Sequence, residues 1–444
     1  MLKKFISWMK TLPDAKPITE QKQIAKQYKL WRIKTFVGMY VGYLCFYLTR
    51  KSLTFAAPSM MHDIGMTKDD YGILGTTMYI TYGIGKFASG ILADKCNIRS
   101  FMAVGLLGTS IVALCFSFIS SIPLLTFLWG VNGGVQSMGF PPTAKGTVYW
   151  FSPNERSFFW TLFSSSKAGG IALLGAISPI CLLLGSWRAI FYVPGILGIM
   201  VAISMIFVLK DKPSSVGLPP IEVYRNDTTL SEEKHSELSN WQVLKKYVFV
   251  NPFVWYIGLA AMFLYFTRWV ALDWGHIFMI ERGLPAAPAA GLLAFMPLFG
   301  VVGSISGGWF ADKFFKGRAA PMTIIYLACL TLSIWGMYHF INLRTSSWFV
   351  IATFLALVGF FVEGAQSLGG GALLARVTLP ESIGAAIGLV GVFEYAGAAC
   401  SGMGGAIMSK SLGWSGLFIF CGISCIITMI FIALTCEKEK IVVV

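Results

Sequence analysis

Repeated apolar runs of about 20 residues constrain this chain more than any other feature of its sequence. A helix of about 20 residues crosses the hydrocarbon core of a bilayer. Only 13% of the 444 residues are charged, whereas a soluble protein carries about 25%. Twelve such runs can be drawn, at 33–58, 70–93, 100–119, 123–149, 158–183, 188–209, 252–280, 287–311, 321–341, 347–375, 383–408 and 414–435. The sequence therefore predicts an all-α integral membrane protein with twelve transmembrane helices, and it argues against a soluble enzyme.

The positive charges follow the loops. The net charge is +14, but the lysines and arginines concentrate before the first span and in every second loop, while the intervening loops hold few. This asymmetry places the cation-rich side, and with it both termini, in the cytoplasm. We therefore expect a multi-pass inner-membrane protein in a lipid bilayer, with no nucleic-acid partner. The opening stretch "MLKKFISWMKTLPDAKP" lacks the apolar core of a cleavable signal peptide.

A long polar segment divides the predicted helices six and six. Residues 210–250 hold prolines and six of the 21 acidic residues, and they are expected to form a cytoplasmic linker. The predicted organisation is a cytoplasmic segment (1–32), a six-helix bundle (33–209), the linker (210–250), a second six-helix bundle (251–436) and a cytoplasmic tail (437–444). The nine cysteines and four histidines show no metal-ligand spacing, so no metal or cofactor is expected.

The two halves repeat each other. "GILADKCNIR" (90–99) matches "GWFADKFFKGR" (308–318), and "VQSMG" (135–139) matches "AQSLG" (365–369). Arg50 and Arg268 are 218 positions apart, the same interval that separates Asp94 from Asp312. Parallel repeats of this kind place a shared binding site near the bilayer midplane.

Charged residues inside the spans point to an anionic ligand. Charge at this depth is costly and normally faces a cavity or a partner. The predicted intramembrane set contains six cations and three acids: Arg50, Lys51, Lys86, Lys145, Lys167 and Arg268, with Asp273, Glu363 and Glu394. Internal pairing cannot neutralise all six cations, so the cavity favours an anion.

The two repeat-matched arginines are the strongest candidates for ligand contact. Arg50 and Arg268 could each grip phosphate oxygens with paired hydrogen bonds. Tyr47 and Tyr265 precede them by one helical turn and share their helix face. Asp273 is expected to be a structural partner, and Lys145, near a helix end, could either bind ligand or serve the fold.

The matched loops suggest a gate. Asp94 and Asp312 are expected at the cytoplasmic ends of the second and eighth helices, beside Arg99 and Arg318. A charge network there could hold one face of the protein closed, or it could be purely static.

These features resemble the major facilitator superfamily and, within it, the organophosphate:phosphate antiporters. The resemblance rests on "GYLCFYLTRKSL", "YITYGIGKFASGILADK", "GLPPIEVYRND", "LDWGHIF" and "GWFADKFFKGR". It implies the major facilitator fold, two six-helix pseudo-repeats that exchange an organic phosphate for inorganic phosphate. The first two segments are most similar to the hexose-phosphate branch, which includes a membrane sensor of glucose 6-phosphate. The resemblance implies the following substrate-site residues: Arg50, Arg268, Lys86, Tyr43, Tyr47, Tyr265 and Tyr395.

Four positions depart from the family pattern. Lys167, in "KAGG", stands where the family has a histidine, and we count it among the substrate-binding residues. Pro297 replaces a glutamate of the eighth helix. Glu363 and Glu394 appear where other residue types are usual. We hypothesise that Glu394 supplies the missing counter-charge for Lys167 or Lys86. Alternatively, a lone carboxylate here could carry a proton. The charge-coupling candidates are thus Glu363, Glu394 and Asp273.

The predicted function is secondary active transport by alternating access, with a hexose phosphate such as glucose 6-phosphate exchanged for inorganic phosphate. Three alternatives remain open. A sensor of glucose 6-phosphate would use the same site and signal through a partner kinase. A proton-coupled organic anion symporter would use the added glutamates. An integral-membrane enzyme is the remote case, because no nucleophile and base occur in a catalytic pattern and no phosphate-binding loop is present.

Overall fold

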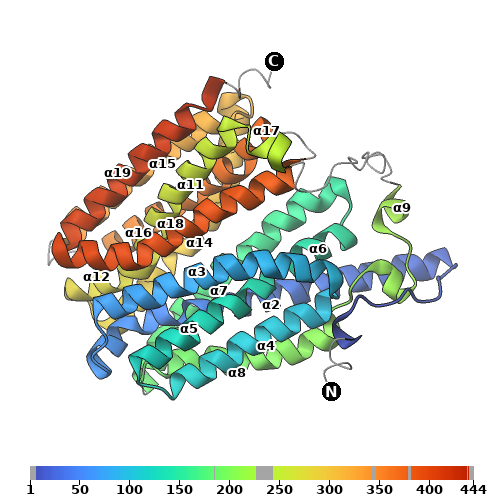
Figure 1. Cartoon of the computed structure of the whole chain (residues 1–444), viewed down its shortest axis with the longest axis horizontal. Helices are drawn as coiled ribbons and strands as arrows, with labels where there is room; N and C mark the ends of the chain where they lie inside the picture. Colours follow the sequence, from blue (N-terminus) through green and yellow to red (C-terminus); the bar gives the residue numbers. More distant parts are fainter. Residues whose placement is uncertain are drawn as a thin grey trace. The chain divides into compact units, whose positions relative to one another are not determined.

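The computed structural model describes residues 7–184, 186–226, 244–342, 347–378, 382–437 and 439. Parts of the predicted linker (210–250) and tail (437–444) lie outside these residues. Within them the chain is helical, and a single antiparallel bridge between Lys10 and Cys96 is the sole strand-like pairing (Figure 1).

Nine helical segments of the described chain are long and apolar enough to span a membrane. They include α4 (Ile98–Ser117), α7 (Pro153–Leu184), α8 (Ala189–Val208), α15 (Ala319–Asn342), α18 (Ile383–Ser411) and α19 (Gly413–Ala433). Each of the other three segments is built from consecutive helices. One consists of α11 (Pro252–Trp269), η5 (Val270–Trp274) and α12 (Gly275–Glu281), and the next of α13 (Ala286–Leu293) and α14 (Phe295–Phe315). The third consists of α16 (Trp348–Gln366), η6 (Ser367–Leu373) and α17 (Leu374–Val377).

The three remaining predicted spans are helical as well. The first and second lie within α2 (Gln21–Asp63) and α3 (Lys68–Lys95), which are less apolar than the other long helices. The fourth consists of two short helices, α5 (Ile122–Gln136) and α6 (Phe140–Trp150), joined by the 3-10 turn η1 (Ser137–Gly139). The all-helical, twelve-span plan of the sequence analysis is therefore confirmed.

The chain forms two compact units. Unit 1 comprises 1–53, 81–171 and 188–234, and unit 2 comprises 54–80, 172–187 and 235–444. The helices α2, α3 and α7 are each divided between them. In unit 1, α4 lies along α8, and in unit 2 the long neighbours are α11 with α18, α14 with α16, and α15 with α19 (Figure 1). The division at 209 and 251 proposed from the sequence stays a prediction about the membrane domains.

Buried carboxylates cap equivalent helices in the two units. Asp211, just after α8, accepts a hydrogen bond from the backbone N–H of Ile98 at 3.0 Å, at the start of α4. Glu439, after α19, accepts from the N–H groups of Ala319 and Ala320 at the start of α15. Free N–H groups and the helix dipole make a helix start favourable for an anion. In each half, the segment that follows the last helix is therefore bonded to the start of the third helix.

The matched glutamines mark where a regular helix ends in both halves. Helix α5 ends at Gln136 and continues as the 3-10 turn η1, while α16 ends at Gln366 and continues as the π-helix η6. The repeat seen in the sequence thus reappears as an interruption at the same place in two helices, although the form of the interruption differs. Such interruptions are frequent at functional sites.

Candidate functional site

The first cluster of candidate residues lies in unit 1 and combines cations with aromatic rings. The guanidinium carbon of Arg50 lies 4.0 Å from the ring centre of Tyr82 and 5.3 Å from that of Tyr47. Arg50 itself is 3% exposed. Tyr43 packs against Tyr47 with ring centres 5.5 Å apart. A cation over an aromatic face is stabilised by the ring quadrupole, so these tyrosines hold a buried guanidinium in place.

Two lysines accompany this first cluster on other helices. The ammonium of half-buried Lys86, on α3, lies 5.1 Å from the ring centre of Phe140 on α6. Lys167, on α7, is also half-buried. Gly170, one turn later, lets α7 approach α2, because an added Cβ would lie 2.5 Å from the carbonyl oxygen of Leu44 and 2.7 Å from Cβ of Tyr47. The "KAGG" motif therefore brings the helix carrying Lys167 against the helix carrying Arg50.

The second cluster lies in unit 2 around Arg268, on α11. Its guanidinium carbon lies 4.8 Å from the ring centre of Trp269 and 5.5 Å from that of Tyr265. An amino group of Arg268 forms an ion pair with the carboxylate of Glu363 on α16. The side chain of Gln366, one turn after Glu363, donates a hydrogen bond of 2.5 Å to the hydroxyl of Tyr265. Helices α11 and α16 thus meet through charge and hydrogen bonding at this point.

Close packing of α14 against α16 positions Glu363. A Cβ added at Gly300 would lie 2.6 Å from Cγ of Glu363, and one at Gly359 would lie 1.8 Å from the carbonyl oxygen of Met296. Ser304, on α14, donates a hydrogen bond of 3.2 Å to the carbonyl oxygen of Glu363. Small residues allow helix backbones to approach in this way. The approach fixes the stem of Glu363 while leaving its side chain 23% exposed.

Glu394 and Tyr395 lie on α18 and are both half-buried. Glu394 lines a small pocket together with Tyr265 and Gln366. Its carboxylate oxygen is 3.7 Å from the place where a Cβ on Gly370 would stand. The pairing of Glu394 with Lys167 or Lys86 stays a prediction, and Glu363 forms an ion pair with Arg268.

Asp273 joins residues of α2 and α3 to η5 within unit 2. Its carboxylate accepts hydrogen bonds from the hydroxyls of Thr54 (2.7 Å) and Tyr79 (2.6 Å), and its carbonyl oxygen accepts one from Tyr71 (2.9 Å). Residues 54–80 come from the first half of the sequence, and Asp273 comes from the second. The arrangement fits the structural role expected for Asp273, in the π-helix η5 one turn beyond Arg268.

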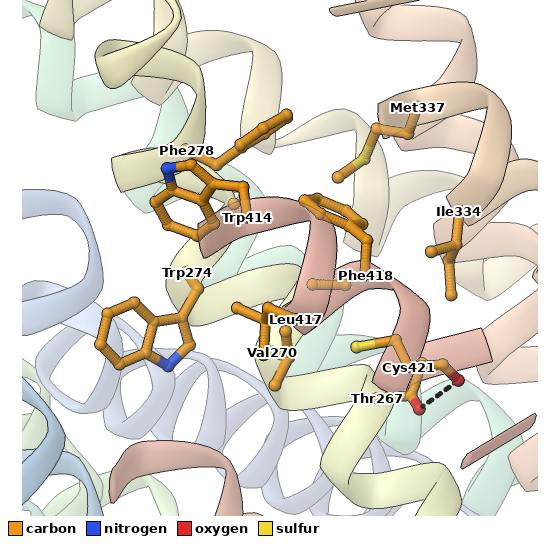
Figure 2. Close-up of a pocket in the computed structure, with 12 residues that line it drawn as sticks. Thr267, Val270, Trp274, Phe278, Ile334, Met337, Trp414, Leu417, Phe418 and Cys421 are labelled. Atoms are coloured by element: carbon orange, nitrogen blue, oxygen red, sulfur yellow. Dashed lines mark hydrogen bonds between the residues drawn. The ribbon is translucent and has the colours of Figure 1, made fainter. Parts of the chain in front are cut away.

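Another face of α11 is mainly apolar. Figure 2 shows a narrow pocket where α11 and η5 face α15 and α19, lined by Val270, Met337, Leu417 and Phe418. The hydroxyl of Thr267 donates a 3.4 Å hydrogen bond to the carbonyl oxygen of Cys421. This face anchors α11 to its neighbours, so the polar face with Arg268 is the candidate binding surface.

Comparison with known proteins identifies the family. The family model described as Major Facilitator Superfamily matches residues 39–343. The chain belongs to the major facilitator superfamily. Among solved structures, the chain is similar to a bacterial homologue of the human lysosomal transporter Spinster in an inward-facing, unoccupied conformation. The match covers 93% of this chain and 97% of that chain, with a TM-score of 0.67 and 14% sequence identity. At that identity the likeness concerns the fold.

Curated relatives narrow the family to the organophosphate:phosphate antiporters. A "Probable hexose phosphate transport protein" of Chlamydia trachomatis is 36% identical over 91% of each chain. The "Membrane sensor protein UhpC" of Salmonella typhimurium is 34% identical over 98% of this chain and 99% of its own. This major facilitator protein is thus a multi-pass membrane protein of a transporter family, not of an enzyme family.

The gate proposed at the matched loops of this major facilitator protein stays a prediction. The side chain of Asp94 lies outside the described residues, and Arg99 lies half-buried in the first turn of α4. The guanidinium of Arg318 donates to the carbonyl oxygen of Phe315 at 3.4 Å. A Cβ added at Gly317 would lie 2.8 Å from an amino group of Arg376 and 3.4 Å from a carboxylate oxygen of Asp312. Arg376, which the sequence reasoning missed, therefore lies at the same loop as Asp312.

Two cations from matched helices stabilise these loops. The ammonium of Lys145 donates to the carbonyl oxygens of Ala93 (3.1 Å) and Cys96 (2.8 Å) at the end of α3. Arg376 pairs with the buried Glu439 at 3.8 Å. Lys145 therefore serves as a helix C-cap, one of the two roles left open for it. Its place near the end of the fourth span was the signal for this role, and Arg376 occupies a similar place after α16.

Proposed function

We propose that this chain exchanges a hexose phosphate, such as glucose 6-phosphate, for inorganic phosphate by alternating access. The observation that carries the proposal is the pair of buried, repeat-matched arginines, with Arg50 in unit 1 and Arg268 in unit 2. Each guanidinium is held over aromatic rings at membrane depth, and its planar fork matches phosphate oxygens. The relative of Chlamydia trachomatis, named for hexose phosphate transport, supports a sugar phosphate as the cargo.

The cation-rich first cluster supports the choice of a dianion. Lys86 and Lys167 add positive charge from α3 and α7 to the half of the protein that holds Arg50. Burying several cations without an anion is costly. A bound phosphate dianion offsets that cost, and this gives a physical reason for exchange, in which the loaded carrier reorients faster than the empty one.

Unit 2 contains contacts between the two halves of the sequence that alternating access would have to break and re-form. Helix ends from the first half of the sequence pack there on the second half, through Asp273 and through small residues. A Cβ added at Gly72 would lie 2.9 Å from the carbonyl oxygen of Gly402. Alternating access requires this close contact to separate once in each cycle.

Counterflow in proteoliposomes tests the proposal. Labelled phosphate is trapped inside, and its exit is measured against a panel of sugar phosphates outside. We expect rapid exchange with glucose 6-phosphate and loss of exchange in Arg50→Ala and in Arg268→Ala. Uptake driven by a pH gradient without internal phosphate would instead establish a proton symporter.

We further propose that the protein sits in the cell inner membrane with both termini cytoplasmic. Val223 on α9 (Ile221–Arg225) is exposed and lies in the linker. A cysteine introduced there in a cysteine-free background should react with a membrane-impermeant maleimide only after the cells are permeabilised. Labelling of intact cells would overturn this topology.

A sensor of glucose 6-phosphate is the second candidate. The similarity to the membrane sensor of Salmonella typhimurium extends over 98% of this chain. A sensor would bind glucose 6-phosphate without measurable counterflow and would associate with a histidine kinase in a ligand-dependent way. Counterflow at a carrier's rate would exclude this reading.

A further inference from the structure

The carboxylate of Glu363 forms an ion pair with Arg268, one of the two arginines proposed to bind phosphate. We propose that Glu363 is a built-in competitor of the substrate phosphate, occupying the Arg268 guanidinium in the empty carrier and yielding it when phosphate binds. The inference rests on the proposed function and deepens it, since it names the residue that sets phosphate affinity. A carboxylate and a phosphate both present two oxygens to the same guanidinium fork.

The geometry favours a positioned anion over a mobile surface acid. Gly300 and Gly359 bring α14 against the stem of Glu363, and Ser304 holds its carbonyl oxygen. Little side-chain freedom is therefore lost when the carboxylate meets Arg268. The side chain nevertheless remains 23% exposed, against 7% for that of Arg268. The carboxylate is thus more exposed than the guanidinium that it contacts.

The repeat shows that this acid belongs to one half only. "VQSMG" matches "AQSLG", so the position that corresponds to Glu363 in the first half is Gly133. Glycine has no side chain to place near Arg50. The carboxylate therefore occurs only in the second half, and the helical structure that the two halves share does not depend on it.

Two functional consequences follow from competition at Arg268. Phosphate has to displace Glu363, so the ion pair weakens phosphate binding. The same pair offsets the charge of Arg268 when no substrate is bound, so the empty carrier can reorient more easily. Wild-type protein should therefore show net phosphate flux alongside exchange, and neutralising Glu363 should shift it toward obligatory exchange.

Binding of inorganic phosphate to the purified full-length protein in nanodiscs tests the first consequence. Loss of a competing charged hydrogen bond should tighten binding about 10-fold in Glu363→Gln. The gain should vanish in the Arg268→Ala background, because the competition acts through that guanidinium. Glu363→Asp, which keeps the charge on a shorter stem, should fall between and serves as a second variant if the glutamine protein is not monodisperse.

Flux in proteoliposomes tests the second consequence. The ratio of net phosphate efflux to phosphate exchange should fall about 10-fold in Glu363→Gln. Asp14→Asn removes the same charge from an exposed pair with Lys212, and it should leave the ratio unchanged.

The outcomes separate the inference from the proposed function. Unchanged phosphate affinity in Glu363→Gln, an equal gain in the Arg268→Ala background, or an unchanged flux ratio would each overturn the inference while exchange itself stands. Failure of the wild-type protein to bind phosphate or any phosphate ester would overturn the proposed function and the inference with it.

Discussion

Arg50 and Arg268 occupy matching places in the repeat but have different neighbours. Arg50 lies over the ring of Tyr82, contributed by α3, with its guanidinium carbon 4.0 Å from the ring centre. Arg268 contacts a carboxylate contributed by α16. The repeat therefore sets the position of each arginine along its helix, whereas the neighbouring helices supply the residues that the guanidinium contacts. Two guanidinium groups in one transporter can thus differ in affinity for the same phosphate.

The matched glutamines show the same divergence. The amide of Gln136 donates to the carbonyl oxygen of Phe46 and to the hydroxyls of Thr49 and Thr109, at 2.8–3.1 Å. The amide of Gln366 donates to the hydroxyl of Tyr265, a residue of the second cluster. One glutamine joins helices inside unit 1, and the other supports the surroundings of Arg268.

Removing either arginine is expected to have the largest effect. Arg50→Ala and Arg268→Ala should each reduce phosphate exchange more than about 100-fold, because a buried charged contact to the substrate is worth about 2–5 kcal/mol. Lysine should restore little activity at either place, since an ammonium lacks the planar fork. Counterflow on protein with normal membrane insertion checks this. Near-normal exchange in one alanine variant would show that the two arginines are not functionally equivalent.

Lys86 and Lys145 sharpen the comparison within unit 1. Lys86 lies beside Phe140 in the first cluster, whereas Lys145 caps the end of α3. Lys86→Met should weaken phosphate binding about 10-fold, as expected for one charged contact worth about 1.4 kcal/mol. Lys145→Met should leave binding intact and lower the thermal stability. The reverse pattern would place Lys145 in the binding site.

The glutamine pair predicts separable defects. Gln136→Leu should destabilise the protein by about 1–3 kcal/mol, because buried hydrogen-bond partners lose their donor. Gln366→Leu should instead weaken glucose 6-phosphate binding about 3-fold with little change in stability. Thermal unfolding and ligand binding, measured on both variants, check the difference. Equal loss of stability in the two would mean that both glutamines serve only the packing of helices.

The smallest effect is expected at an exposed pair that belongs to neither cluster. The hydrogen bond from Lys212 lowers the pKa of Asp14 below its ordinary value. A lowered carboxyl pKa contributes stability that is present above the ordinary pKa and is lost as pH falls through the lowered one. The pair therefore adds no pH dependence between about pH 5 and 8. Exchange by Asp14→Asn should match wild type across this range, and a new pH dependence would implicate the N-terminal segment in transport.

Residue chemistry and spacing along the chain were sufficient for the helical plan. Apolar runs long enough to cross a bilayer predicted the spans, because backbone polar groups in hydrocarbon must bond within a helix. The matched segments 218 positions apart predicted the two halves and singled out Arg50 and Arg268. Lysines in alternate loops give the proposed orientation. These features depend on local sequence and on the membrane as solvent, so they need no knowledge of which helices touch.

The partners of the charged residues were decided only by the packing of helices far apart in sequence. From sequence, Glu394 was the hypothesised counter-charge, for Lys167 or Lys86, whereas the glycines of α14 and α16 bring Glu363 to Arg268. In the same way, Arg376, after α16, lies beside Gly317 in the loop after Asp312 and pairs with Glu439 from the end of the chain. Two charged side chains that are close in sequence can point in different directions. A charged side chain from a neighbouring packed helix can make contact although it is far away in sequence. Ion pairing acts over a few ångströms, and only the tertiary structure sets distances on that scale.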